Sequence, residues 1–95
     1  MSENTGEPST MKNEITYPVR WEYRVFVECD MLTAAREILE NILAEQDERA
    51  ELTDSERSSS GKYLALRARA EVASKAEAET LGRRLAAVPG VKFVL

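Results

Sequence analysis

One stretch decides the fold, and it reads Ser58-Ser59-Ser60-Gly61-Lys62-Tyr63-Leu64-Ala65-Leu66-Arg67-Ala68-Arg69-Ala70-Glu71-Val72. From residue 63 onward, alternate positions form two different faces. One face carries Leu64, Leu66, Ala68, Ala70 and Val72, and the other carries Tyr63, Ala65, Arg67, Arg69 and Glu71. Alternation of this length predicts a half-buried strand, with the first face against a core and the second in water.

The composition excludes several classes of protein. The chain has 95 residues, a formal net charge of −4, one cysteine and no histidine. An acidic balance disfavours phosphate-backbone binding, and the lack of histidine removes the commonest general base and metal ligand. A single cysteine rules out an internal disulfide and fits a reducing cytoplasm. No long apolar run and no hydrophobic signal core is present, so we expect a cytoplasmic protein that does not engage a membrane.

The chain divides into a tail and one domain. Residues 1–16 are mostly Ser, Glu, Asn, Thr, Gly and Pro, which predicts a disordered N-terminal tail. Residues 17–95 then carry all the periodic patterns, so we expect them to form a single domain.

The first periodic segment, residues 20–29, predicts a strand. Its core face would carry Trp21, Tyr23, Val25, Val27 and Cys29, and its outer face Arg20, Glu22, Arg24, Phe26 and Glu28. Asp30 is a plausible N-cap for a helix that follows and runs to about residue 46. The apolar stripe of that helix comprises Ala35, Ile38, Leu39, Ile42 and Leu43.

The rest of the chain supplies a short charged edge strand, a second helix and a last strand. The edge strand is expected over residues 50–54. Ser74 and Glu77 have the spacing of a capping box for a helix that runs to about residue 88, with Ala78, Leu81, Leu85 and Val88 buried. Gly82, near that stripe, predicts a close approach of helix to sheet. The last strand, residues 91–95, is expected to point Val91, Phe93 and Leu95 inward and Lys92 and Val94 outward.

The resulting order is β-α-β-β-α-β. Two helices on one face of a four-stranded antiparallel sheet, in strand order 4-1-3-2, cover every apolar stripe. The sequence therefore predicts an α+β protein with the ferredoxin-like fold.

Three motifs resemble the YbeD-like family of small bacterial proteins. They are Tyr17-Pro18 before the first strand, the turn Ser58-Ser59-x-Gly61-x-Tyr63, and the last residues, Val91-Lys92-Phe93-Val94-Leu95. The resemblance covers residues 17–95. It implies a domain of unknown function with a ferredoxin-like fold similar to ACT regulatory domains, and a connection with lipoate metabolism. It also implies a regulatory or protein-binding module without established catalytic residues.

The outer face of the predicted sheet is the candidate site. We expect Arg24, Phe26, Tyr63, Arg67 and Arg69 to bind a protein partner or a second copy of the chain, because aromatics and arginines carry much of the energy of interfaces. The alternative is a solvated lattice of cross-strand Arg–Glu pairs. The alternative function is an ACT-type sensor that binds a small metabolite at a subunit interface.

Other chemistries on this fold find less support. RNA-recognition modules stack bases on aromatics of the central strand, whereas this strand offers only Tyr63, so we expect no nucleic-acid partner. Cys29 and Met31 could bind Cu(I), but a lone cysteine in an inward register is more often a core thiol, so we expect no metal. The loop after the first strand has no Arg or Gly to cradle a phosphate. We therefore expect neither enzymatic activity nor a cofactor. The serines at 58–60 with Gly61 could bind an anion or be phosphorylated, but a hairpin turn is the simpler interpretation.

Overall fold

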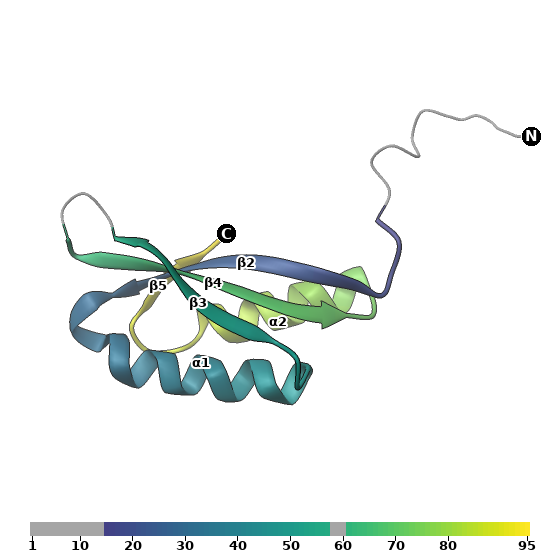
Figure 1. Cartoon of the computed structure of the whole chain (residues 1–95), viewed down its shortest axis with the longest axis horizontal. Coiled ribbons are helices and arrows are strands. Elements are labelled where there is room, and N and C mark those ends of the chain that lie inside the picture. The colour runs from purple at the N-terminus through teal and green to yellow at the C-terminus, as the bar shows by residue number, and fades with distance from the viewer. Residues whose placement is uncertain (1–14, 58–60) are drawn as a thin grey trace, which may run out of the picture.

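The computed structural model describes residues 15–57 and 61–95. Its elements are β2 (Val19–Glu28), the 3-10 turn η2 (Cys29–Met31), α1 (Leu32–Gln46), β3 (Glu51–Arg57), β4 (Tyr63–Val72), α2 (Lys75–Ala86) and β5 (Val91–Val94). The strands form one antiparallel sheet in the order β3-β4-β2-β5, which confirms the predicted topology. Both helices lie on the same side of the sheet (Figure 1). Most of the predicted tail and the turn serines fall outside the described residues.

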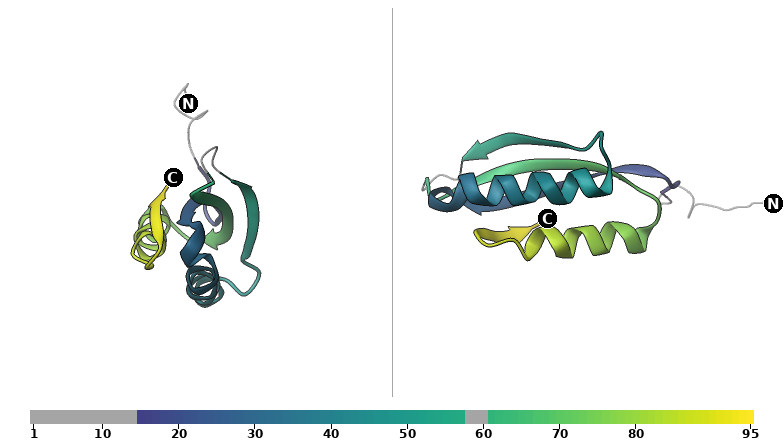
Figure 2. Two further views of the ribbon diagram at one scale, coloured as in Figure 1. Left: turned by 90° about the vertical axis from the view of Figure 1, so that its left-hand side faces the viewer. Right: turned by 90° about the horizontal axis from the view of Figure 1, so that it is seen from below.

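The core lies between the sheet and the two helices, which run alongside each other beneath it (Figure 2). The inward side chains of β4 and of the middle of β2 are buried, as the alternation predicts. The helix α2 buries Ala78, Leu81 and Leu85 as expected, but it ends at Ala86, so the buried Val88 lies just beyond it. The buried core residues are Tyr23, Val25, Val27, Ala35, Leu39, Leu43, Leu64, Leu66, Ala68, Ala70, Val72, Ala78, Leu81, Leu85 and Val88. Trp21 and Cys29 are only half-buried at the two ends of their strand face.

The strands pair over very different lengths. β2 and β4 pair along their whole length, from Val19↔Val72 to Glu28↔Tyr63. β5 pairs only with Val25–Val27 of β2 and adds one further pair of hydrogen bonds at Arg24. Among the residues that the structure describes, the first half of β2 therefore has a strand neighbour on one side only.

The first helix departs from the prediction in two ways. Asp30 is not its N-cap, because the chain first makes the turn η2 and α1 begins at Leu32 with Met31 as N-cap and no side-chain capping bond. Ile38 is 40% exposed, so its predicted burial is wrong. The helix contacts the sheet along a narrow line, for which Ala35 and Leu39 with one further leucine suffice.

The last strand departs from its predicted register. Phe26 pairs with Phe93 and Val27 pairs with Val91, so Lys92 is an extra residue in a β-bulge. A bulge shifts the alternation by one position. Val94 consequently faces inward, opposite Val25, while Phe93 and Leu95 are 46% and 68% exposed. The predicted inward orientation of Phe93 and Leu95 is wrong.

The second helix begins as its sequence predicts. Ser74 Oγ accepts a hydrogen bond of 3.1 Å from the Glu77 backbone N–H. The Glu77 carboxylate reaches back and accepts from the backbone N–H of Ala73 at 2.5 Å. The capping box therefore closes one residue earlier than its standard form, in which the N-cap N–H is the donor.

Gly82 brings α2 close to the sheet. A Cβ atom at this position would lie 3.3 Å from Cε2 of Tyr23. The same tyrosine donates a hydrogen bond of 2.6 Å from its buried hydroxyl to the Ala78 carbonyl, and this bond fixes the position of the ring.

We expect Gly82→Ala to change the melting temperature little, because the gain in helix propensity offsets the tight contact between the new methyl group and the Tyr23 ring. Gly82→Leu should lower it by several degrees. Equal melting temperatures for the leucine variant and the wild type would contradict the close approach.

Candidate functional site

The five predicted site residues all lie on the open face, which we define as the side of the sheet opposite the helices. Arg24 and Phe26 are on β2, and Tyr63, Arg67 and Arg69 are on β4. The register places Arg24 directly opposite Arg67 and Phe26 opposite Ala65. Tyr63 lies at the end of the ladder, opposite Glu28, and so stands apart from the other four.

An aromatic pair occupies the open face where β2 meets β5. The rings of Phe26 and Phe93 stack with their centroids 4.4 Å apart and their planes 20° apart. The guanidinium carbon of Arg24 lies 5.3 Å from the centroid of Phe26, in cation–π geometry. Sequence reasoning missed Phe93, because the sequence Val-Lys-Phe-Val fits either register and only the bulge decides between them.

Ala65 is buried although it lies on the open face. Its position in the alternation predicts exposure, but it is only 2% exposed and does not belong to the core cluster. Its cross-strand partner is Phe26, and a methyl group beside such a ring is easily covered. The predicted exposure of Ala65 is therefore wrong.

Arg24 lies beside the aromatic pair, and Arg67, Arg69 and Glu22 follow it along β4 and β2. Glu22 contacts both Arg67, at 3.1 Å, and Arg69, at 3.0 Å. The contact to Arg69 is a hydrogen bond, whereas the shielded Nε of Arg67 makes an ion pair but no hydrogen bond within the described residues. Like charges directly opposite on neighbouring strands, as at Arg24 and Arg67, are unfavourable. In the described residues, Arg67 and Arg69 therefore share the single carboxylate of Glu22.

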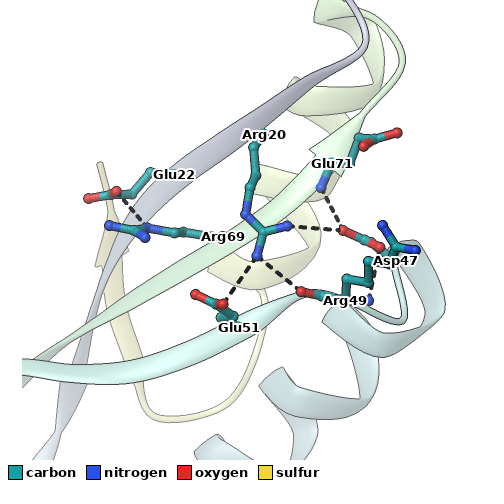
Figure 3. A network of polar contacts seen from close by, with 7 residues as sticks. All are labelled: Arg20, Glu22, Asp47, Arg49, Glu51, Arg69 and Glu71. Carbon is teal, nitrogen blue, oxygen red and sulfur yellow. Dashed lines mark hydrogen bonds and ion pairs between the residues drawn. The ribbon is translucent and has the colours of Figure 1, made fainter.

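A second polar network lies at the other end of the open face (Figure 3). Arg20 lies 3.5 Å from the carboxylate of Glu51 and 3.9 Å from that of Asp47, and it donates a 3.0 Å hydrogen bond to the Arg49 carbonyl. Asp47 accepts from the backbone N–H groups of Arg49 and Glu71, each at 3.0 Å. The network ties β2, β4 and the α1–β3 connection together.

These contacts lower the pKa of Asp47. The hydrogen bonds from the Glu71 and Arg49 backbones are the main causes, and the charge of Arg20 adds to them. A folded pKa below the unfolded value stabilises the fold at pH above the unfolded pKa, and this contribution is lost as pH falls through the folded pKa.

Asp47→Asn should therefore lower the melting temperature at pH 7 and have a smaller effect in acid, below the folded pKa. Thermal unfolding across this pH range measures the difference. The exposed neighbour Glu48, changed to Gln, serves as the control, and an equal pH dependence in the two variants would contradict the role of Asp47.

Cys29 lies at the end of the inward face of the first strand. It is half-buried and packs against the core cluster. It also lines a hollow of about 340 Å³ together with Glu28, Asp30, Gly61, Lys62 and Tyr63. Within residues 15–57 and 61–95, no group of three or more His, Cys, Asp or Glu residues is placed to hold a metal ion.

Neither helix in the described part of the chain is long and apolar enough to cross a membrane.

Solved structures support the fold assignment. A solution structure of protein HP0495 from Helicobacter pylori matches with a TM-score of 0.68 and 20% identity, over 96% of this chain and 98% of that one. A second solution structure, of hypothetical protein HP0495 from the same organism, gives a TM-score of 0.65 and 20% identity over 90% and 100% of the chains. A solution structure of the C-terminal domain of the MgtC protein from Mycobacterium tuberculosis gives a TM-score of 0.60 and 19% identity, over 86% of this chain and 89% of that one.

The family assignment rests on the sequence. None of the curated proteins matches this chain. The sequence model of a family described as "Protein of unknown function (DUF493)" matches residues 12–95. This confirms the resemblance to YbeD-like proteins, and the chain belongs to the DUF493 family.

Proposed function

We propose that this protein is a non-enzymatic protein-binding module whose partner docks on the open face, over the Phe26–Phe93 pair. One observation carries the proposal: Phe93 is 46% exposed although it stacks on a second aromatic ring. An exposed aromatic pair offers a large, rigid apolar contact at little cost in side-chain entropy. Aromatic and arginine side chains are also the types that dominate binding energy at interfaces.

The charges around the pair favour an acidic partner. Arg67 and Arg69 share one carboxylate, that of Glu22, and Arg24 lies directly opposite Arg67 in the ladder. Complementary charge mainly raises the association rate and selects among partners. Since the whole chain has a net charge of −4, the cluster also orients an acidic partner toward this face. The family resemblance implies a connection with lipoate metabolism, so proteins that attach lipoate are the first candidates to test.

The experiment compares two substitutions of exposed apolar residues. Tagged wild type, Phe93→Ala and Ile38→Ala are used for affinity capture from the native lysate, followed by affinity measurements with any stoichiometric partner. Phe93 and Ile38 have similar exposure, 46% and 40%, but Ile38 lies on α1, away from the open face. We expect Phe93→Ala to weaken partner binding by about tenfold or more, and Ile38→Ala to leave it unchanged.

Charge is tested separately. Arg67→Ala combined with Arg69→Ala should slow association and reduce its dependence on salt. A partner that binds the Phe93 variant as tightly as the wild type, or whose association rate does not depend on salt, would contradict docking at this face.

A further inference from the structure

One edge of β2 remains open in the described chain. Arg24 and Leu95 exchange two backbone hydrogen bonds, of 3.0 and 2.8 Å, and there the pairing with β5 ends. Because the backbone groups of a strand alternate in direction, the N–H and C=O groups of Arg20 and Glu22 point to the same side as those of Arg24. No other strand in residues 15–57 and 61–95 covers them. Pro18, which lacks an N–H, lies just before this open edge.

An apolar groove runs beside the open edge. It has a volume of about 470 Å³ and lies between β2 and α2, with the end of β5 closing it. Trp21 lines the groove, and its ring stacks on that of Tyr17 with the ring centroids 6.5 Å apart. On the helix side the lining includes Ala78, Gly82 and Ala86, whose small side chains leave the groove unfilled.

We propose that a second copy of this chain pairs along the open edge, antiparallel, so that two sheets join into one. Residues 19–23 form the whole open edge, with Trp21 at its centre. In an antiparallel pair, all five residues of one edge face the five residues of the other only when Trp21 lies opposite Trp21 of the partner subunit. The chain bends away at residues 17–18 (Figure 1), which leaves room for Leu95 of the partner subunit.

The charges of the edge agree with this register. Arg20 lies opposite Glu22 of the partner subunit, and Glu22 lies opposite Arg20 of the partner subunit. These two pairs are also the ones whose N–H and C=O groups face the edge, so they form the hydrogen-bonded positions of the new ladder. Opposite charges directly across an antiparallel ladder are favourable, and each pair extends an ion-pair lattice that already exists within one chain.

The groove accommodates the remaining side chains. Trp21 stands on the helix side of the sheet, since its partner on β4 is the buried Ala70. In the proposed register the two indoles meet at a position without hydrogen bonds, where cross-strand side chains are closest. They would cover the groove from both sides, next to Gly82 and the exposed Leu95.

Cysteine cross-linking tests the register directly. In a Cys29→Ser background, Trp21→Cys places two thiols across the two-fold axis, where Cα atoms of such a pair lie about 4.5 Å apart, within disulfide range. With oxidised glutathione as the oxidant, we expect a disulfide-linked dimer. Ile38→Cys in the same background, on exposed α1, is the control. Cross-linking at position 21 that is no faster than at position 38 would overturn the proposal.

Sedimentation measures the association itself, from about 10 µM to about 1 mM. We expect the wild type to show a monomer–dimer equilibrium. Trp21→Lys, which brings two ammonium groups together at the axis, should raise the dimer dissociation constant at least tenfold. Phe93→Lys, the same change on the open face away from the edge, should leave it unchanged. A wild type that stays monomeric throughout, or a Trp21 variant that dimerises equally well, would contradict the edge dimer. Partner capture that depends on Phe93 is a separate result, so the two proposals can fail independently.

Discussion

Gly90→Ala should lower the free energy of unfolding by about 2–5 kcal/mol. The residue has a φ of +95°, a backbone conformation that costs a residue with a side chain about 1–2 kcal/mol. A Cβ atom there would also lie 2.8 Å from Cβ of Met31, closer than such atoms pack. Relieving an overlap of this kind costs about 1–3 kcal/mol more.

The matched control is Gly61→Ala. Gly61 has a φ of +76°, but in the described part of the chain, its two neighbours aside, no atom lies within 4 Å of where its Cβ would stand. This variant should therefore lose only the conformational part, about 1–2 kcal/mol. Urea unfolding of both variants measures the difference. Equal losses would show that the contact between residue 90 and Met31 does not constrain the turn before β5. That contact matters for the site, because the Gly90 carbonyl accepts a 2.9 Å hydrogen bond from the Glu28 N–H and so helps to place β5.

Leu39→Ala should cost about 2–5 kcal/mol, the range for large-to-small changes in a close-packed core. Leu39 is fully buried at the centre of α1, facing the sheet. Its neighbour Ile38 is 40% exposed, and Ile38→Ala should change stability by about 0.5 kcal/mol or less. The two substitutions thus test which side of α1 faces the core. Urea or thermal unfolding provides the measurement, and similar losses at the two positions would contradict the orientation of the helix.

The long strands and the second helix could be predicted because their patterns have one interpretation. The alternation in β2 and β4 fixes which side chains are buried, and burial of the Val25 and Leu66 faces then requires helices on that side. Ser74 marks the start of α2 through a local hydrogen bond that depends on little else. Once these elements are placed, the strand order follows from covering the apolar faces.

Other features depend on contacts that are remote in sequence. Asp30 has the right residue type for an N-cap, but the Cys29 N–H donates to the Lys62 carbonyl at 2.8 Å and the chain makes a 3-10 turn before α1 begins. Ile38 fits the apolar stripe of α1, but the helix contacts the sheet along a line too narrow to cover it. Residue propensities alone therefore predict neither the 3-10 turn before α1 nor the exposure of Ile38.

In the candidate site, too, some residues could be placed from the local pattern and others depend on contacts that are remote in sequence. Arg24, Phe26, Arg67 and Arg69 could be placed together from alternation alone. Phe93 could not, because a single extra residue at Lys92 reverses the orientation of the side chains that follow it. The open edge of β2 is likewise invisible in the sequence, since it results from the shortness of β5.

The functional proposal depends on Phe93 standing on the open face against Phe26. Solution NMR tests this most directly, with nuclear Overhauser contacts of the Phe93 ring and its broadening by a dissolved gadolinium chelate. We predict ring-to-ring contacts between Phe93 and Phe26 and strong broadening of the Phe93 signals. Contacts from Phe93 to Leu39 or Val25, together with protection from the chelate, would place the ring in the core and contradict the account.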